Sequence, residues 1–220
     1  MRTIRNEPVR ARRTQAQRRA ETRRKLMEAA TRMVCERGYA NASMVEIARR
    51  AGVSRGASQH HFGTRYDLFE ALGEELTESM HAMARKIAVT GGSLEERVHA
   101  AIDYYWALYS SLSFHAVLNI YLGLSHDRER PNKLQHDIAN VYRGSDQPWI
   151  DLLGDSKESR RLLRSLRGMV LATLRGLAVA RFLGVITGSV EAELTLLREM
   201  TLDRLSRDPA ESSRARTRRR

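Results

Sequence analysis

Polar side chains suited to nucleic-acid recognition are concentrated between residues 43 and 65. Amide and guanidinium groups form paired hydrogen bonds with base edges, whereas hydroxyl groups and basic side chains contact phosphate oxygens. The chemistry available to this stretch is therefore hydrogen bonding to bases and phosphates. The residues expected to make these contacts are Ser43, Ser54, Arg55, Ser58, Gln59, His60, Thr64 and Arg65.

Two short helices joined by a tight turn would hold these side chains in place. Ser43 and Glu46 have the spacing of a capping box at the start of the first helix, and Gly52 can end that helix with a positive φ angle. Ser54 can cap the second helix, whose Phe62 would pack inward. This pattern is typical of a helix-turn-helix, in which the second helix enters the major groove. The side chains expected to point away from the core are Arg55, Ser58, Gln59 and His60.

Amphipathic helices flank this motif on both sides. A helix predicted from about Arg18 to Glu36 carries apolar residues three and four positions apart. Another begins at Thr64, with Asp67 at the capping-box position, and its apolar stripe runs to Ile87. Because this helix is too long for the front domain alone, we expect it to connect that domain to the rest of the chain.

The remainder of the chain is predicted to be helical, with no convincing strand. The helices expected there span about 94–112, 113–124, 134–142, 157–185 and 190–205. The fold class is therefore all-α, with a three-helix domain at residues 18–70 and a larger helical domain at residues 71–208. Residues 1–17 and 209–220 are rich in arginine and poor in apolar side chains, so they are predicted to be a disordered arm and tail.

Positive charge is concentrated at the front of the chain. The protein has 220 residues and a formal net charge of +12. Residues 1–70 contain 16 Lys or Arg and 7 Asp or Glu, whereas residues 71–209 contain 17 and 18. A basic front on a near-neutral body is typical of a polyanion-binding module on a globular carrier. The arm is either a solvated tail or a segment that follows the DNA backbone or minor groove, and the sequence leaves both roles open.

Neither a catalytic centre nor a metal site is indicated. There is no glycine-rich phosphate loop, nucleophile elbow or paired-carboxylate motif. His60 and His61 point about 100° apart on a helix, so they cannot easily share one ion. Cys35 is the one cysteine, and its apolar position predicts a buried structural thiol. Because the N-terminus has no signal-peptide core and no stretch is a good membrane span, we expect a cytoplasmic protein without a cofactor.

The residues around the predicted turn carry a family resemblance. Over roughly residues 20–72, the chain resembles the tetracycline-repressor (TetR) family of bacterial regulators in the order and spacing of its motifs. The matching segments are Gly38-Tyr39, Ser43-Met44-Val45-Glu46-Ile47-Ala48, Ala51-Gly52-Val53-Ser54-Arg55-Gly56-Ala57, His61-Phe62-Gly63-Thr64-Arg65 and Leu68-Phe69. The resemblance implies a three-helix DNA-binding head and a helical regulatory body. It also implies a homodimer paired through the last two helices, at about residues 157–206, and a small-molecule effector that releases the protein from its operator.

Three positions depart from the family pattern. Many family members have Tyr where this chain has Gln59, an apolar residue where it has Ser58, and Lys where it has Arg65. The amide of Gln59 can pair with adenine, whereas the family tyrosine commonly contacts phosphate. Arg65 would still serve as a phosphate contact at the start of a helix.

Aromatic and soft side chains are concentrated in the middle helices. Plain core packing would explain such a set, but the family resemblance favours an effector cavity between the helices. The residues expected to line it are Tyr105, Trp106, Tyr109, Phe114, Tyr121, Trp149 and Met169. For Arg164, Arg167 and Arg175 the sequence leaves three roles open: a solvated charge, an ion pair across the dimer, or a contact with an anionic ligand.

Together, these features predict a ligand-responsive transcriptional regulator, a repressor by resemblance, that binds a palindromic operator as a homodimer. Its expected partners are double-stranded DNA, a second copy of the chain and an unidentified small molecule. The alternative is a sequence-independent basic DNA-binding protein held by its arm and tail, for which affinity would depend steeply on salt.

Overall fold

The computed structural model describes residues 14–88, 91–125, 146–153 and 160–206, and every regular element in these ranges is helical. The predicted all-α class is confirmed. In these ranges no single helix is long and apolar enough to cross a membrane. The helices Leu94–Tyr109 and Leu112–Leu124 have sufficient length and apolar content only when taken together, and they are bent by 59° relative to each other. The helices are α1 (Gln15–Arg37), α2 (Met44–Ala51), α3 (Arg55–His61), α4 (Arg65–Ala88), α5 (Leu94–Tyr109), α6 (Leu112–Leu124), α8 (Asp146–Leu152), α9 (Arg160–Phe182) and α10 (Glu191–Ser206), with a 3₁₀ turn, η1, at Tyr39–Asn41.

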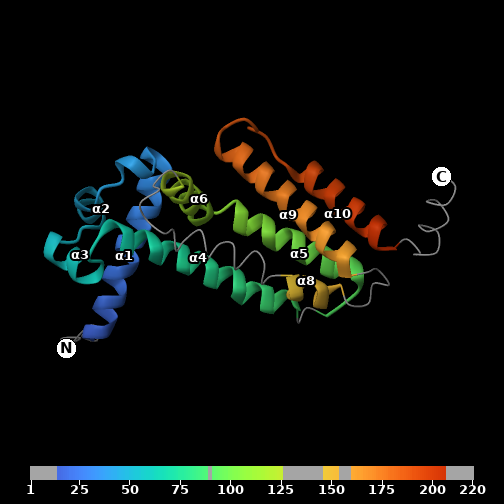
Figure 1. Ribbon diagram of the computed structural model, residues 1–220, viewed down its shortest axis with the longest axis horizontal. Helices are drawn as coiled ribbons and strands as arrows, with labels where there is room; N and C mark the ends of the chain where they lie inside the picture. The colour runs from blue at the N-terminus through green and yellow to red at the C-terminus, as the bar shows by residue number, and fades with distance from the viewer. Residues whose placement is uncertain (1–13, 89–90, 126–145, 154–159, 207–220) are drawn as a thin grey trace, which may run out of the picture.

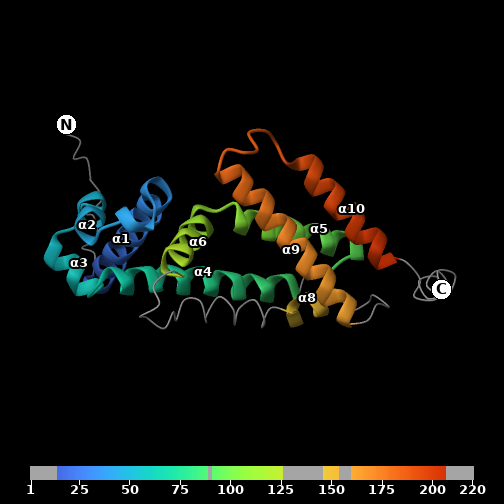
Figure 2. The ribbon, with the colours of Figure 1, turned by 45° about the horizontal axis from the view of Figure 1, so that its top comes forward.

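Helix α4 connects the two ends of an elongated molecule. Helices α1, α2 and α3 form a head around its first turns, and the remaining helices form a body along its later turns (Figure 1). Within the body, α4 contacts α5, α6 and α8, while α9 and α10 contact α5. Figure 2 shows α9 crossing α5 and reaching α8, with α10 on the side of α5 away from α4. The division predicted at residues 70/71 thus falls inside one continuous helix, which is the connecting helix that the sequence led us to expect.

The core of the head is built on one face of α1. Leu26, Ala30 and Met33 lie three and four positions apart and are fully buried. Ile47 of α2 and Leu68 of α4 belong to the same buried cluster, which is continuous with the core of the body. Since burying one such large apolar side chain contributes roughly 1.5–3 kcal/mol, this packing stabilises α2 and α3, which are too short to be stable alone.

A close approach at Gly123 joins the head to α6. A Cβ atom at position 123 would lie 2.3 Å from Cδ1 and 2.6 Å from Cγ of Tyr39, so only glycine permits this contact. The Tyr39 ring also lies 5.5 Å from the ring of Phe69, between centroids. The η1 turn is therefore held between α6 of the body and α4.

The start of α1 differs from the prediction. The helix begins at Gln15 rather than about residue 18, because Thr14 and Gln17 form a reciprocal capping box. Residues 14–17, predicted to belong to the disordered arm, are therefore the N-terminal turn of a helix. The rest of the predicted arm and all of the predicted tail lie outside the described residues.

Three other helix limits also differ or cannot be compared. The break between α5 and α6 falls at Ser110–Ser111 rather than at residue 113, because Ser111 Oγ accepts from the Phe114 N–H (3.2 Å) and caps α6. Helix α9 ends at Phe182 rather than at residue 185. The helix predicted at 134–142 lies outside the described residues.

Cys35 is half-buried, rather than fully buried as predicted. Its thiol donates to the carbonyl of Leu112 (3.5 Å), so it forms another contact between α1 and α6. Burial, with a smaller effect from Glu36, raises the pKa of the Cys35 thiol to about 11. The neutral, unreactive form is therefore favoured, in keeping with a structural role.

Candidate nucleic-acid interface

Short-range hydrogen bonds fix α2 and α3 around the turn. Ser43 Oγ accepts from the Glu46 N–H (3.3 Å) at the start of α2, and Ser54 Oγ accepts from the Ala57 N–H (3.2 Å) at the start of α3. Gly52 ends α2 with φ 64° and ψ 33°, in the left-handed region that favours glycine. The caps and the turn predicted for the helix-turn-helix are therefore present.

One half of the predicted capping box at α2 is absent. The Glu46 carboxylate does not return to the Ser43 N–H, because it accepts two hydrogen bonds from Arg49 at 2.8 and 2.5 Å. The Arg37 guanidinium lies 3.8 Å from Glu46 Oε1. The hydrogen bond from Arg49 lowers the pKa of Glu46, so the carboxylate stays ionised and its charge is compensated by guanidinium groups.

The outward face of α3 presents three of the predicted base-reading side chains. Arg55, Gln59 and His60 are exposed, and the first two lie four positions apart on one face of the helix. Their donors and acceptors can therefore reach base edges if α3 enters a major groove. His61, one position further along, is half-buried, as expected for a residue that packs at the end of the helix rather than one that reads a base.

Ser58 was wrongly predicted to point outward. Its exposed fraction is 1%, and its hydroxyl donates to the carbonyl of Arg55 (2.8 Å). The residue lies four positions before Phe62, so both side chains face the core. Because the hydroxyl is satisfied by the backbone, burial costs little. The sequence could have indicated this core position, because many members of the resembling family have an apolar residue where this chain has Ser58.

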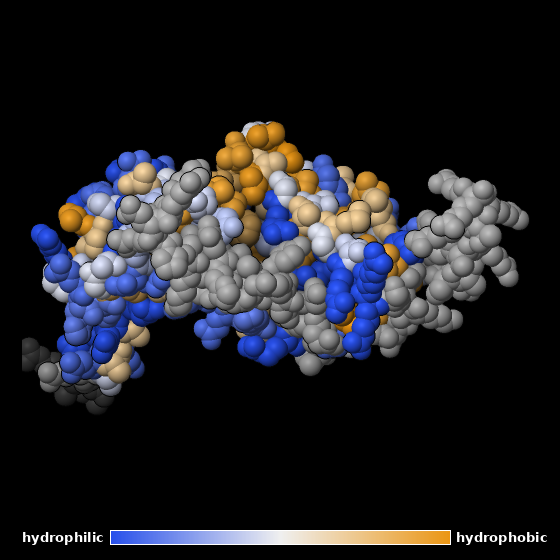
Figure 3. Space-filling model, viewed as in Figure 1, coloured by the Kyte–Doolittle hydropathy of each residue, from blue (hydrophilic) through white to orange (hydrophobic). Residues whose placement is uncertain are grey.

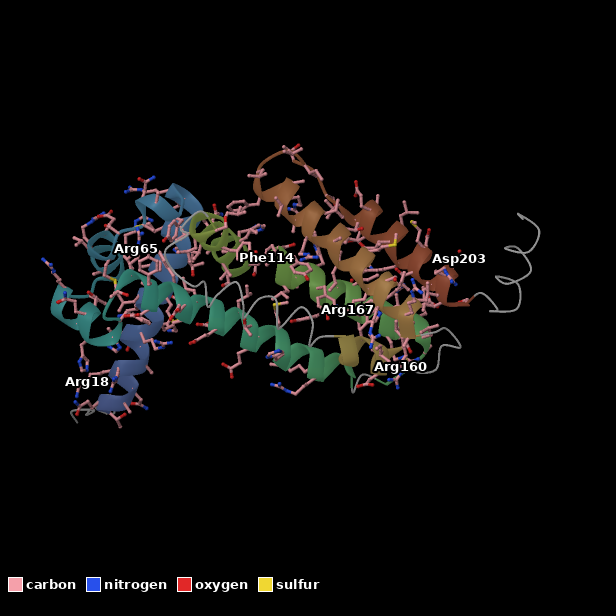
Figure 4. The ribbon with its side chains drawn as sticks, in the orientation of Figure 1. Arg18, Arg65, Phe114, Arg160, Arg167 and Asp203 are labelled. Carbon is pink, nitrogen blue, oxygen red and sulfur yellow. The ribbon has the colours of Figure 1, made fainter. Side chains whose placement is uncertain are left out.

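Thr64 and Arg65 lie at the start of α4, beside the end of α3. Thr64 and Asp67 form the predicted capping box, with the Thr64 N–H donating to Asp67 Oδ2 (2.7 Å) and the Asp67 N–H donating to Thr64 Oγ1 (3.2 Å). The Arg65 guanidinium lies 4.8 Å from the ring centroid of Tyr39 and 5.7 Å from that of Phe69. Arg65 is therefore a half-buried charge supported by aromatic rings, at a helix N-terminus that favours an anion (Figure 4).

In the body, four of the seven predicted effector residues form one aromatic cluster. The Tyr105 ring centroid lies 6.2 Å from that of Tyr109 and 6.3 Å from that of Trp149, and Tyr109 lies 4.9 Å from Phe114. Helices α5, α6 and α8 supply these rings. Tyr105, Tyr109 and Trp149 are buried, so they belong to the core as well as to a candidate ligand site.

The other three predicted effector residues lie outside this cluster. Met169 is 66% exposed, because α9 buries its opposite face, which includes Leu163 and Val170. It cannot line an internal cavity, and its prediction as an effector contact was wrong. Trp106 is half-buried beneath Arg181, whose guanidinium lies 6.0 Å from the ring centroid. Tyr121 is half-buried on α6.

Two polar residues lie beside these rings: Arg167, for which a contact with an anionic ligand was one of three roles left open, and His115, which the sequence did not single out. Arg167 is 3% exposed, and it interacts with the Tyr105 hydroxyl. Burial raises the pKa of Tyr105, while the charge and hydrogen bond of Arg167 lower it. His115 is also buried, with its ring stacked 4.2 Å from that of Phe182, and burial lowers the pKa of its imidazole. The sequence could have indicated that Arg167 is buried, because this residue lies within the apolar stripe of α9.

Buried nitrogen atoms mark the same region. Within the described residues, His115 Nδ1 and Trp149 Nε1 have no hydrogen-bond partner. Such atoms are uncommon in protein interiors, because leaving a polar group unsatisfied costs about 1–3 kcal/mol. They make this cluster a candidate site for a small molecule with hydrogen-bonding groups.

A separate groove of about 820 Å³ lies between α1, α4 and the start of α6. Met27, Leu76 and Leu112 contribute its apolar surface, and Arg23 and Arg32 lie along it. None of the seven predicted effector residues lines this groove. Among the described residues, no group of three or more His, Cys, Asp or Glu side chains could hold a metal ion.

Comparisons with known proteins match the head most strongly. The family model described as bacterial regulatory proteins, tetR family, matches residues 26–72. The chain is 30% identical over 172 residues to the HTH-type transcriptional regulator CymR of Pseudomonas putida, covering 76% of this chain and 83% of that protein. It is 42% identical over 65 residues to the HTH-type transcriptional regulator TtgR, also of Pseudomonas putida, covering 30% and 31% of the two chains.

Solved structures extend the similarity of the fold to the body. The fatty acid degradation regulator FadR of Bacillus halodurans superposes with a TM-score of 0.64 at 19% identity, covering 82% of this chain and 94% of that one. Salmonella enterica GusR superposes with a TM-score of 0.60 at 19% identity, covering 84% and 96%. At this level of identity, the similarity concerns the fold alone.

Proposed function

The chain belongs to the TetR family of bacterial regulatory proteins, and from this premise we propose that it is a ligand-responsive repressor that binds a palindromic operator as a homodimer. Regulation of transcription through DNA binding follows from the family itself. The observation that carries the proposal is the exposed face of α3, with Arg55, Gln59 and His60 on a helix that is capped at Ser54. These three side chains are proposed to read bases. The proposed phosphate contacts are Ser43, Ser54, Thr64 and Arg65.

Exposed apolar side chains on the last two helices support the homodimer. Leu183 and Val185, which follow α9, and Leu196 and Met200 on α10 are all more than half exposed. Figure 3 shows apolar side chains gathered over the end of α9 and its connection to α10. Exposed apolar surface of this kind marks an interaction site, and two copies of an α9–α10 pair can form a four-helix interface. A two-fold axis through it would place two α3 helices on inverted half-sites.

The aromatic cluster supports a small-molecule effector in the body. Tyr105, Tyr109 and Trp149 supply flat apolar surface, while Trp149 Nε1 and His115 Nδ1 supply hydrogen-bonding atoms. A ligand there would contact α5, α6 and α8, all of which pack against α4. Because α4 also carries Arg65 at its head end, a shift of α4 would change the spacing of the two α3 helices. The effector would then favour the dimer conformation that does not fit the operator.

The decisive experiment measures sequence preference. The full chain selects a duplex from a randomised pool, and its affinity for that duplex is compared with its affinity for a scrambled duplex of equal composition at physiological salt. We expect a preference of roughly 10³-fold or more. Equal affinities would instead support the sequence-independent DNA-binding protein, and would overturn the repressor proposal.

The effector part of the proposal has its own test. Compounds from a panel of small aromatic and aliphatic molecules are scored by release of the selected duplex. For a compound that releases it, Trp149→Phe keeps an aromatic ring but removes Nε1, so a higher concentration should be needed. If the compound concentration needed to release the duplex is unchanged in both Trp149→Phe and His115→Phe, the effector does not bind in this cluster.

A further inference from the structure

The N-terminal half of α1 lies outside the packed head. Figure 1 shows it projecting past α3. Residues 15–25 have no buried side chain, whereas burial begins at Leu26, which is also where the family-model match begins. This segment carries five basic residues and one acidic residue. A helix segment without buried apolar side chains gains little stability from a core, and the cap at Thr14 stabilises its first turn.

The positive charges of this segment are not all compensated. Lys25 pairs with Glu21 at 3.2 Å, and Arg24 pairs with Glu28 at 2.5 Å. Arg18 and Arg19 form no ion pair within the described residues, and both are exposed. These two guanidinium groups are therefore available to an external anion.

Arg18 and Arg19 face a hollow that also includes the end of α3. The hollow measures about 830 Å³, and Arg18, Arg19 and Thr22 of α1 line it together with His60 and His61. Arg23 keeps α1 against the end of α3, since its guanidinium lies 4.8 Å from the ring centroid of Phe62. The hollow therefore begins where the exposed face of α3 ends, because His60 belongs to both.

Every charged or titratable side chain identified at this hollow is basic. Burial lowers the pKa of His61, and the charges of Arg19, His60 and Arg23 lower it further. Such positive potential, on a surface continuous with the α3 face, suits the next phosphate groups of the same duplex.

We propose that this hollow binds the DNA backbone, so that the first turns of α1 form a second phosphate clamp beside the helix-turn-helix. The inference rests on the proposed DNA-binding role of α3. Arg18 and Arg19 contact phosphate oxygens, and Thr22 and His60 line the same hollow. The clamp adds affinity and fixes how the head sits on the duplex, but it carries no sequence information.

The test compares salt dependence in matched double variants of the full chain. The probes are the selected duplex and its scrambled counterpart, titrated by fluorescence anisotropy between low and physiological salt. Removing both charges, in Arg18→Ala with Arg19→Ala, should lower the slope of log affinity against log salt by about 1–2, because each phosphate contact contributes about 0.9. Affinity for the two duplexes should fall by the same factor. Arg18→Lys with Arg19→Lys should keep most of the slope.

The control removes an equivalent arginine pair at the far end of the molecule. Arg160 and Arg161 are adjacent, exposed residues at the start of α9, and Figure 4 shows Arg160 at the opposite end from Arg18. Arg160→Ala with Arg161→Ala makes the same change in net charge and should leave the slope unchanged. Far-UV circular dichroism checks folding, which exposed Arg-to-Ala changes on a helix should preserve.

The outcomes separate this inference from the proposed function. If the wild-type chain prefers the selected duplex, and the α1 and α9 double variants have equal slopes, the phosphate clamp is refuted while the repressor proposal stands. If the wild-type chain has no preference, the repressor proposal fails. If the Arg18→Ala, Arg19→Ala variant loses affinity only for the selected duplex, the clamp is also refuted, because α1 would then read bases.

Discussion

Gly123 offers a direct test of how the body supports the DNA-binding head. The substitution Gly123→Ala would place a Cβ atom 2.3 Å from Tyr39 Cδ1, 2.6 Å from Cγ and 3.0 Å from Cβ. These atoms are close to the backbone of η1, so the clash cannot be relieved by moving only the tip of a side chain. Overpacking of this kind typically costs about 1–3 kcal/mol.

The matched control is Gly56→Ala in α3, where an added Cβ atom meets nothing within 4 Å. Both substitutions replace a helical glycine, so both gain about 0.5–1 kcal/mol from helix propensity. The clash should therefore separate the two variants by about 1–3 kcal/mol. For a chain of this length, this difference corresponds to a gap in melting temperature of roughly 2–12 °C, with Gly123→Ala the lower.

Thermal melting, followed by far-UV circular dichroism at one protein concentration, measures this gap. The Tyr39→Ala background provides an internal check. Without the Tyr39 ring, Gly123→Ala should lower the melting temperature only slightly. DNA binding should also weaken in Gly123→Ala, because Tyr39 supports Arg65 at 4.8 Å. If the Gly123→Ala and Gly56→Ala variants melt together, the tight η1–α6 contact is refuted.

Three further predictions concern binding and assembly. Gln59→Ala should lose about 1–3 kcal/mol of discrimination between the selected duplex and a duplex mutated at one base pair, with little change in salt slope, as measured by anisotropy titration. Affinity for DNA should rise as pH falls from about 8 to 6. In the free protein, burial and the charge of Arg19 lower the pKa of His61, and a bound phosphate would raise it, so binding takes up a proton. The pH dependence of the affinity should shrink in His61→Asn, and an unchanged profile would contradict this coupling. Leu196→Lys with Met200→Lys should convert the dimer to a species near 25.1 kDa by light scattering, and a mass that stays at twice this value would place the interface elsewhere.

The sequence by itself determined the helix-turn-helix. Its signals act over three or four residues: Ser43 and Ser54 accept backbone N–H groups at helix starts, and Gly52 adopts a left-handed conformation. Such interactions form wherever the chain bends in that way, so residue type and spacing were sufficient. The connecting role of α4 was also predictable, because its apolar stripe is longer than the head needs.

The sequence was weaker where a helix has two plausible inner faces. Helix α3 has only seven residues, too few for apolar periodicity to fix its rotation, and Ser58 was placed outside although it faces the core. In α9, Met169 was placed inside, whereas the buried face includes Arg167. Which face is buried depends on the neighbouring helices, here α5 and α8, and no local pattern encodes that choice.

The tertiary structure alone decided which distant residues meet. Arg18 and His60 line one hollow although they are 42 positions apart, and Tyr39 meets Gly123 across a still longer separation. The aromatic cluster likewise joins Tyr105 to Trp149 through the packing of α5 against its neighbours. Contacts of this kind depend on helix rotation and crossing, which are set by the summed burial of many side chains rather than by any short motif.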